Sequence, residues 1–67
     1  MSAVGTPLNR WRVGYLSVHG HGWADFSSLA EARRFAQQAR RDGCQQVTIM
    51  REYESGSNYY ADFRRLS

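Results

Sequence analysis

The sequence predicts an α+β domain of the order ββαββ, in which four strands form a mostly antiparallel sheet and one helix packs on one face. Three observations predict this fold: one segment has clear helix start and stop signals, alternating β-rich segments lie on both sides of it, and glycine-containing turns separate those segments. Sixty-seven residues allow a single domain. We expect this domain to occupy residues 10–67, after a flexible N-terminal tail over residues 1–9.

The predicted helix lies between Ser28 and Gly43. Ser28 and Glu31 have the spacing of a capping box, which satisfies backbone donors in the first turn. Gly43 can adopt the left-handed conformation that ends a helix. One arc of about 120° is apolar, and it consists of Leu29, Ala32, Phe35, Ala36 and Ala39. We expect this arc to pack on the sheet against Val47, Ile49 and Phe63.

The strands are predicted from alternation and from their content of β-branched and aromatic residues. His19–Gly22 contains two glycines between apolar segments, which indicates a hairpin turn, and Ser55–Asn58 indicates another. We therefore expect the first strand to pair with the second, and the third with the fourth. The expected strands are Arg10–Val18, Trp23–Phe26, Gln45–Tyr53 and Tyr59–Leu66.

One helix can cover only one face of such a sheet, so the other face should be open. Alternation assigns to the helix side Trp11, Val13, Tyr15, Val47, Ile49, Ala61 and Phe63. It assigns to the open face Arg12, Leu16, Trp23, Thr48, Met50, Glu52, Tyr60, Asp62 and Arg64. Aromatic residues, methionine and arginine are enriched at the centres of protein interfaces.

We therefore predict that a partner binds this open face, and that arginines on the exposed side of the helix take part. The predicted partner-binding residues of the sheet are Arg12, Trp23, Met50, Tyr60 and Arg64. Those of the helix are Arg33, Arg34, Arg40 and Arg41. Two alternatives remain: a second copy of the chain could cover the open face as a homodimer, or aromatic side chains there could stack on single-stranded bases.

The charge and the cysteine content limit the classes of protein to which this chain can belong. The formal net charge is +3, since nine arginines and no lysine stand against six acidic residues, and this argues against a mimic of nucleic acid. A single cysteine, Cys44, excludes an intrachain disulfide and favours a cytoplasmic protein. No apolar segment approaches the roughly 20 residues that span a bilayer, and the N-terminus lacks the pattern of a signal peptide.

No catalytic or metal-binding motif is present, so we expect a protein that is not an enzyme and uses no cofactor. The sequence has no nucleophile with a plausible base, no glycine-rich phosphate loop and no close pair of carboxylates with a pocket to tune it. Glu52 and Glu54 lie in or beside a predicted strand and turn. His19 and His21 could share one side of a strand, but only Cys44 and Asp25 could complete a zinc site. A polar hairpin turn is the preferred interpretation of the histidines, and core packing that of Cys44.

The segment from Ser28 to Ala36, followed by Gly43-Cys44 and by Val47 to Arg51, resembles small phage-encoded anti-CRISPR proteins. The resemblance covers about half of the chain and consists of a capped helix followed by a β-rich hairpin. It implies an inhibitor that docks on a CRISPR surveillance complex in the host bacterial cytoplasm and blocks nucleic-acid binding or nuclease recruitment. The resemblance assigns no role to any individual residue of this chain.

The leading hypothesis is therefore a small, non-enzymatic binding protein that docks on a host nucleoprotein complex. The alternative is a basic module that binds nucleic acid directly, through the helix arginines and the aromatic sheet face. Affinity for nucleic acid would fall steeply with salt, because arginine–phosphate contacts release counterions.

Overall fold

The computed structural model describes residues 5–55 and 62–66. Its elements are β1 (Pro7–Ser17), β2 (Gly20–Phe26), α1 (Leu29–Arg41), β3 (Gln45–Tyr53) and β4 (Asp62–Arg65). This is the expected ββαββ order. The four strands form one antiparallel sheet in the order β2-β1-β3-β4. The hairpin pairings predicted from the sequence are confirmed, and β1 and β3 are the central strands.

Helix α1 begins and ends where the sequence predicts. The Oγ atom of Ser28 accepts a hydrogen bond from the Glu31 amide at 3.5 Å. At the other end Gly43 has a φ of 87°, its amide donates to Arg40, and the Cys44 amide donates to Ala39. These two backbone bonds form a Schellman motif, which pairs carbonyl groups that the end of a helix leaves free.

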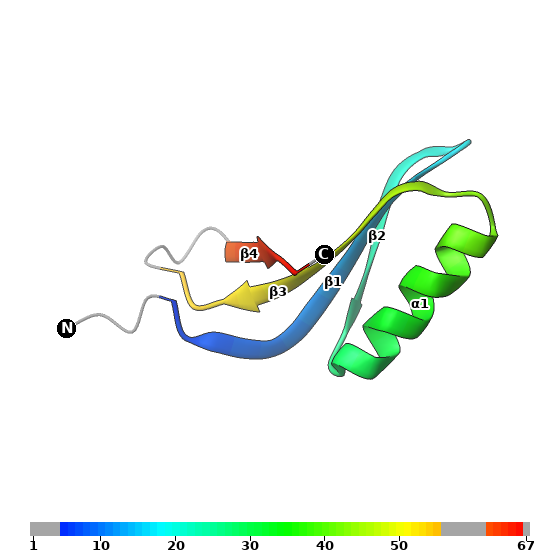
Figure 1. Ribbon diagram of the computed structural model, residues 1–67. Coiled ribbons are helices and arrows are strands. Elements are labelled where there is room, and N and C mark those ends of the chain that lie inside the picture. Colours follow the sequence, from blue (N-terminus) through cyan, green and yellow to red (C-terminus); the bar gives the residue numbers. More distant parts are fainter. Residues whose placement is uncertain (1–4, 56–61, 67) are drawn as a thin grey trace.

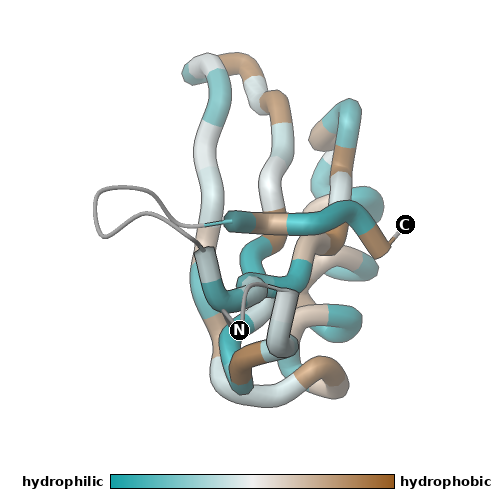
Figure 2. The backbone as a smooth tube through the Cα atoms, turned by 90° about the vertical axis from the view of Figure 1, so that its left-hand side faces the viewer, coloured by the Kyte–Doolittle hydropathy of each residue, from teal (hydrophilic) through white to brown (hydrophobic). Residues whose placement is uncertain are grey.

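The helix packs on β1, β2 and β3 and forms a second layer beside the sheet (Figure 1). Ala32 and Ala36 are completely buried, and their small side chains bring the helix close to the sheet. Along α1, weakly hydrophobic and hydrophilic residues alternate (Figure 2). The core consists of Trp11, Val13, Ala32, Ala36 and Ile49, with Phe26, Leu29, Phe35 and Val47 packed against it.

The first hairpin turns earlier than expected. Ser17 pairs with Gly20, so the turn consists of Val18 and His19 and not of His19–Gly22. Gly20 has a φ of 105°, whereas neither turn residue has a positive φ. This combination is typical of a type I turn followed by a glycine bulge. Strand β2 consequently begins at Gly20, before the expected start at Trp23.

Strand β1 also begins earlier than expected, at Pro7 and not at Arg10. Pro7 pairs with Tyr53, and the Gly5 amide donates to the carbonyl of Glu54 at 2.9 Å. The interpretation of residues 7–9 as tail is therefore wrong. The register shifts between Pro7 and Trp11, because β1 has more residues there than the facing segment of β3. Such a β-bulge interrupts the alternation of side chains and bends the strand.

The register of β4 is the opposite of the expected one. Phe63 pairs with Glu52, which places its side chain on the open face and away from α1. Arg64 pairs with Arg51, and Arg51 pairs with the core residue Trp11, so Arg64 lies on the helix side. The same correction applies to Asp62. A shift of one residue exchanges the two faces of a strand, and the predicted residues Tyr60 and Ala61 lie outside the described residues.

Candidate binding surfaces

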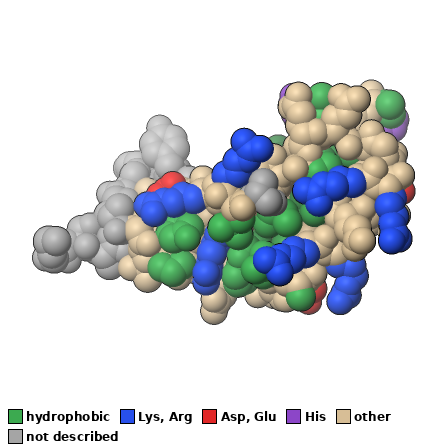
Figure 3. Space-filling view, viewed as in Figure 1, with side chains coloured by type: hydrophobic (Ala, Val, Ile, Leu, Met, Phe, Trp, Pro, Cys, Tyr) green, Lys and Arg blue, Asp and Glu red, His purple; other side chains and the backbone are tan. Residues whose placement is uncertain are grey.

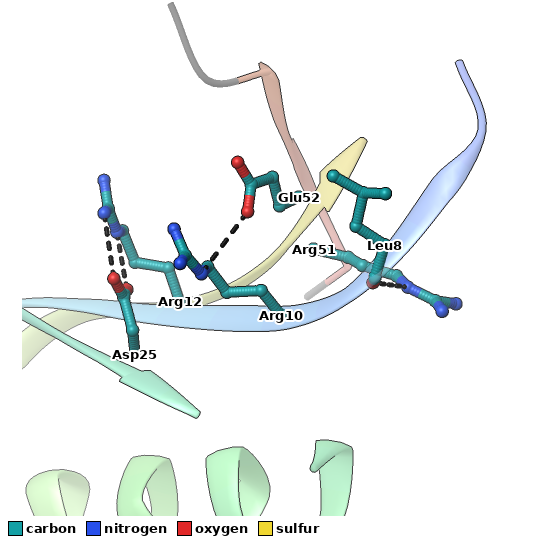
Figure 4. A network of polar contacts seen from close by, with 6 residues as sticks. All are labelled: Leu8, Arg10, Arg12, Asp25, Arg51 and Glu52. Carbon is teal, nitrogen blue, oxygen red and sulfur yellow. Dashed lines mark hydrogen bonds and ion pairs between the residues drawn. The ribbon is translucent and has the colours of Figure 1, made fainter. Parts of the chain in front are cut away.

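The centre of the open face is an arginine held by a carboxylate on the neighbouring strand. Arg12 and Asp25 are directly opposite one another on β1 and β2. The Nε atom of Arg12 donates to Oδ1 of Asp25 at 2.7 Å, and Nη2 donates to Oδ2 at 3.0 Å. Figure 4 shows this bidentate pair on the side of the sheet away from α1. Bidentate pairing fixes the orientation of the guanidinium group.

The same contact changes the ionisation of both partners. The hydrogen bond from Arg12 lowers the pKa of the Asp25 carboxyl group, against the opposing effect of partial burial. The hydrogen bond to Asp25 raises the pKa of Arg12. The pair is therefore fully charged at neutral pH.

Two aromatic rings flank the fixed guanidinium. The Cζ atom of Arg12 lies 4.1 Å from the ring centroid of Phe63 and 5.4 Å from that of Trp23. Both distances are within the range of a cation–π contact. The Trp23 side chain nevertheless stays largely open to solvent, since the residue is 63% exposed. It is the largest exposed hydrophobic side chain in residues 5–55 and 62–66.

The residue beside Trp23 on the neighbouring strand is a glycine and has no side chain. Gly14 of β1 is paired with Trp23 on one side and with Thr48 on the other. A Cβ atom at Gly14 would lie 3.3 Å from the Cε atom of Met50. The predicted residues Arg12, Trp23 and Met50 are thus brought together around a bare stretch of backbone.

Other charges on the open face are also paired. The Nε atom of Arg10 lies 3.4 Å from Oε1 of Glu52, again on the side away from the helix (Figure 4). Arg65, opposite Met50, is exposed on this face. Because most of the charge is neutralised internally, the open face combines an exposed indole with little net charge.

The helix arginines form a separate surface. Arg33, Arg34, Arg40 and Arg41 are all exposed, and within the described part of the chain none of them forms an ion pair. The predicted set of partner-binding residues therefore lies on two surfaces. Arg12, Trp23 and Met50 belong to the open face, whereas Arg64 and the helix arginines lie on the helix side of the sheet.

Sequence reasoning missed Asp25 and Phe63 as members of the open face. The signal for Asp25 is the position of the turn, because a hairpin that closes at Ser17 and Gly20 necessarily aligns Arg12 with Asp25. A turn placed at His19–Gly22 hides this alignment. No comparable signal fixes the register of β4.

Across residues 5–55 and 62–66, no cluster of three or more histidine, cysteine, aspartate or glutamate side chains could hold a metal ion. The helix of this described region is too short and polar to cross a membrane. Comparisons with protein-family models, curated proteins and solved structures return no match for this chain.

Proposed function

We propose that the chain is a non-catalytic protein-binding module that docks on a host nucleoprotein complex through the open face of its sheet. The observation that carries this proposal is the Trp23 indole, which is 63% exposed beside a guanidinium that Asp25 holds in place. Tryptophan is one of the residues that are enriched among those carrying most of the binding energy of protein interfaces. An anchor whose neighbours are already fixed loses little conformational entropy on binding.

The chemistry of the open face favours a protein surface with an apolar cavity as the occupant. Arg12 and Arg10 each have a carboxylate partner within the sheet, so a strongly charged partner would find few free charges there. Trp23 and Met50 offer apolar surface on either side of Gly14. A cavity that accepts the indole would bury this apolar area and leave the ion pairs at the rim, where water still reaches them.

The resemblance to anti-CRISPR proteins supplies the partner to test first, a CRISPR surveillance complex of a bacterial host. An inhibitor of this kind acts in the cytoplasm and needs no catalytic group. Binding on the complex would block its access to nucleic acid or its recruitment of a nuclease.

The test is capture of surveillance complexes by the immobilised protein, followed by affinity measurements with the retained complex. Trp23→Ala should weaken binding by at least about 30-fold, because a desolvated tryptophan anchor contributes about 2 kcal/mol or more. Val18→Ala is the matched control, since Val18 is 96% exposed on the hairpin turn, away from the proposed site. Equal affinity of the two variants, or no retained nucleoprotein component, would overturn the proposal. A concentration-dependent dimer that Trp23→Ala dissociates would assign the face to a second copy.

A further inference from the structure

Two arginines lie directly opposite one another on the helix side of the sheet. Arg51 of β3 and Arg64 of β4 form a cross-strand pair. Like charges in this position destabilise a sheet. In the described part of the chain only one carboxylate contacts either group, that of Asp62, at 3.4 Å from Nη2 of Arg64. Among the described residues, two positive charges thus face a single carboxylate.

Each of these guanidinium groups is held in place by an aromatic ring. The Cζ atom of Arg51 lies 4.7 Å from the ring centroid of Trp11, and that of Arg64 lies 4.4 Å from the ring centroid of Tyr53. Arg51 also donates from Nε to the Leu8 carbonyl oxygen at 2.9 Å (Figure 4). Its Nη2 atom donates to Oδ1 of Asn9 at 3.5 Å, and within the described residues no hydrogen bond uses Nη1. A guanidinium group has five N–H donors, so Arg51 has further donors for an external acceptor.

Helix arginines extend this charge along the same side. Phe35 contacts Tyr15 and Phe26, so the opposite edge of α1, which carries Arg33 and Arg40, lies toward β3. Figure 3 looks onto this side of the molecule from the edge formed by β4, and arginine side chains surround a small apolar area there. The basic track, defined as Arg33, Arg40, Arg51 and Arg64, joins α1, β3 and β4.

We propose that this basic track binds the phosphodiester backbone of nucleic acid, independently of the open face and of its proposed partner. Guanidinium groups match phosphate oxygens in geometry and charge, and they can bind them in bidentate fashion. Trp11 is 9% exposed beneath Arg51, so its ring is not available for stacking on bases. The track therefore contacts phosphates and not bases, and binding should be independent of sequence.

An acidic protein is the competing occupant, and the observations favour nucleic acid. A protein interface of high affinity needs a large anchor at its centre. The exposed large hydrophobic side chains beside the track are those of Leu8, whose carbonyl accepts from Arg51, and Leu66, whose amide donates to Ile49. Neither is aromatic, and no aromatic side chain of the described residues is exposed there. A basic track that spreads over three elements, with Asp62 as its one carboxylate contact among the described residues, fits a polyanion with regularly spaced charges.

The experiment uses neighbouring arginines as matched controls. Arg33→Gln with Arg64→Gln removes two charges from the track, whereas Arg34→Gln with Arg65→Gln removes two charges from adjacent positions outside it. Binding of short duplex DNA is measured by fluorescence anisotropy at several salt concentrations. Thermal melts show whether both double variants fold like the unchanged protein.

We expect the track variant to lose affinity and to reduce the slope of log affinity against log salt by about 1.8, or about 0.9 for each phosphate contact removed. The control variant should keep the slope of the unchanged protein within about 0.5. Equal losses in both variants would mean that net charge alone causes binding and would overturn the site. Absence of salt-dependent binding to DNA, or equally tight binding of a polyglutamate peptide to the track, would overturn the assignment to phosphodiesters. None of these outcomes depends on capture through Trp23, so the two proposals fail separately.

Discussion

Arg12 and Phe63 are in contact across β3, with the Cζ atom 4.1 Å from the ring centroid. The contact ties the N-terminal hairpin to the last strand on the open face. Because the Arg12 guanidinium is already fixed by Asp25, little entropy is lost in placing it over the ring. We predict that a double-mutant cycle of Arg12→Ala and Phe63→Ala gives a favourable coupling of about 0.5–1 kcal/mol in urea unfolding. A coupling of zero would contradict the register of β4.

The Arg12–Asp25 pair predicts a specific pH dependence of stability. The hydrogen bond from Arg12 lowers the pKa of Asp25 below its unfolded value near 3.8. The pair therefore stabilises the folded chain above that pH, and this stabilisation is lost as the pH falls through the lowered pKa. Its magnitude should be below about 1 kcal/mol, because water screens a partly exposed pair.

We predict that Asp25→Asn lowers the free energy of unfolding at neutral pH, and that the difference from the unchanged protein shrinks as the pH falls below about 4. Urea titrations at a series of pH values measure this. Asp42→Asn is the control, since Asp42 forms no ion pair within the described residues. A difference for Asp25→Asn that persists at the lowest pH would show that the pair does not stabilise the fold.

The sequence predicts the helix, the strand order along the chain and the third strand well, because those elements carry strong local signals. Ser28 and Gly43 mark the ends of α1 through their own backbone chemistry. Gln45–Tyr53 alternates over a long segment, and the structure confirms its bounds. Local signals of this kind do not require knowledge of any distant residue.

The rest depends on how strands align, which local patterns do not determine. Alternation along Tyr59–Leu66 predicts Phe63 on the helix side, but β4 is short and a shift of one residue moves it to the other face. The bulge in β1 between Pro7 and Trp11 similarly breaks alternation. The candidate site was therefore predicted in part: Trp23, Met50 and Arg12 share the open face, whereas Arg64 does not.

Phe35 should contribute to stability through the two rings that it contacts. Its ring centroid lies 5.3 Å from that of Phe26 and 5.8 Å from that of Tyr15. We predict that Phe35→Ala lowers the free energy of unfolding by about 3 kcal/mol, whereas Phe35→Leu costs less than about 1.5 kcal/mol. Thermal and urea unfolding measure both effects. Unchanged stability of Phe35→Ala would show that this edge of the helix does not pack on the sheet.

Gly22 provides a sharper test of the same packing. A Cβ atom at Gly22 would lie 2.7 Å from the Cζ atom of Tyr15, so any side chain must displace that ring. We predict that Gly22→Ala destabilises the fold by about 1–3 kcal/mol, since the Tyr15 ring also contacts Phe35. Gly14→Ala is the control, because its Cβ would meet only the flexible end of Met50 at 3.3 Å. If both variants unfold at the same urea concentration, the ring of Tyr15 does not lie over Gly22.

The open face and the helix arginines should affect binding of a protein partner in different ways. Trp23 offers a large apolar surface that is desolvated on binding, whereas exposed ion pairs formed by long arginines contribute only about 0–1 kcal/mol each. We predict that affinity for the partner resides in Trp23 and Met50, and in Tyr60 outside the described residues. Alanine at these positions should raise the dissociation rate at least about tenfold.

Alanine at Arg33, Arg34, Arg40 and Arg41 should instead lower the association rate and weaken its dependence on salt, because charges outside a desolvated contact act mainly during approach. Surface plasmon resonance with the captured complex separates the two rates. The same measurement would also detect the opposite assignment of the two rates. If the arginine variants abolish binding while Trp23→Ala leaves the dissociation rate unchanged, the partner binds the helix side and not the open face of the sheet.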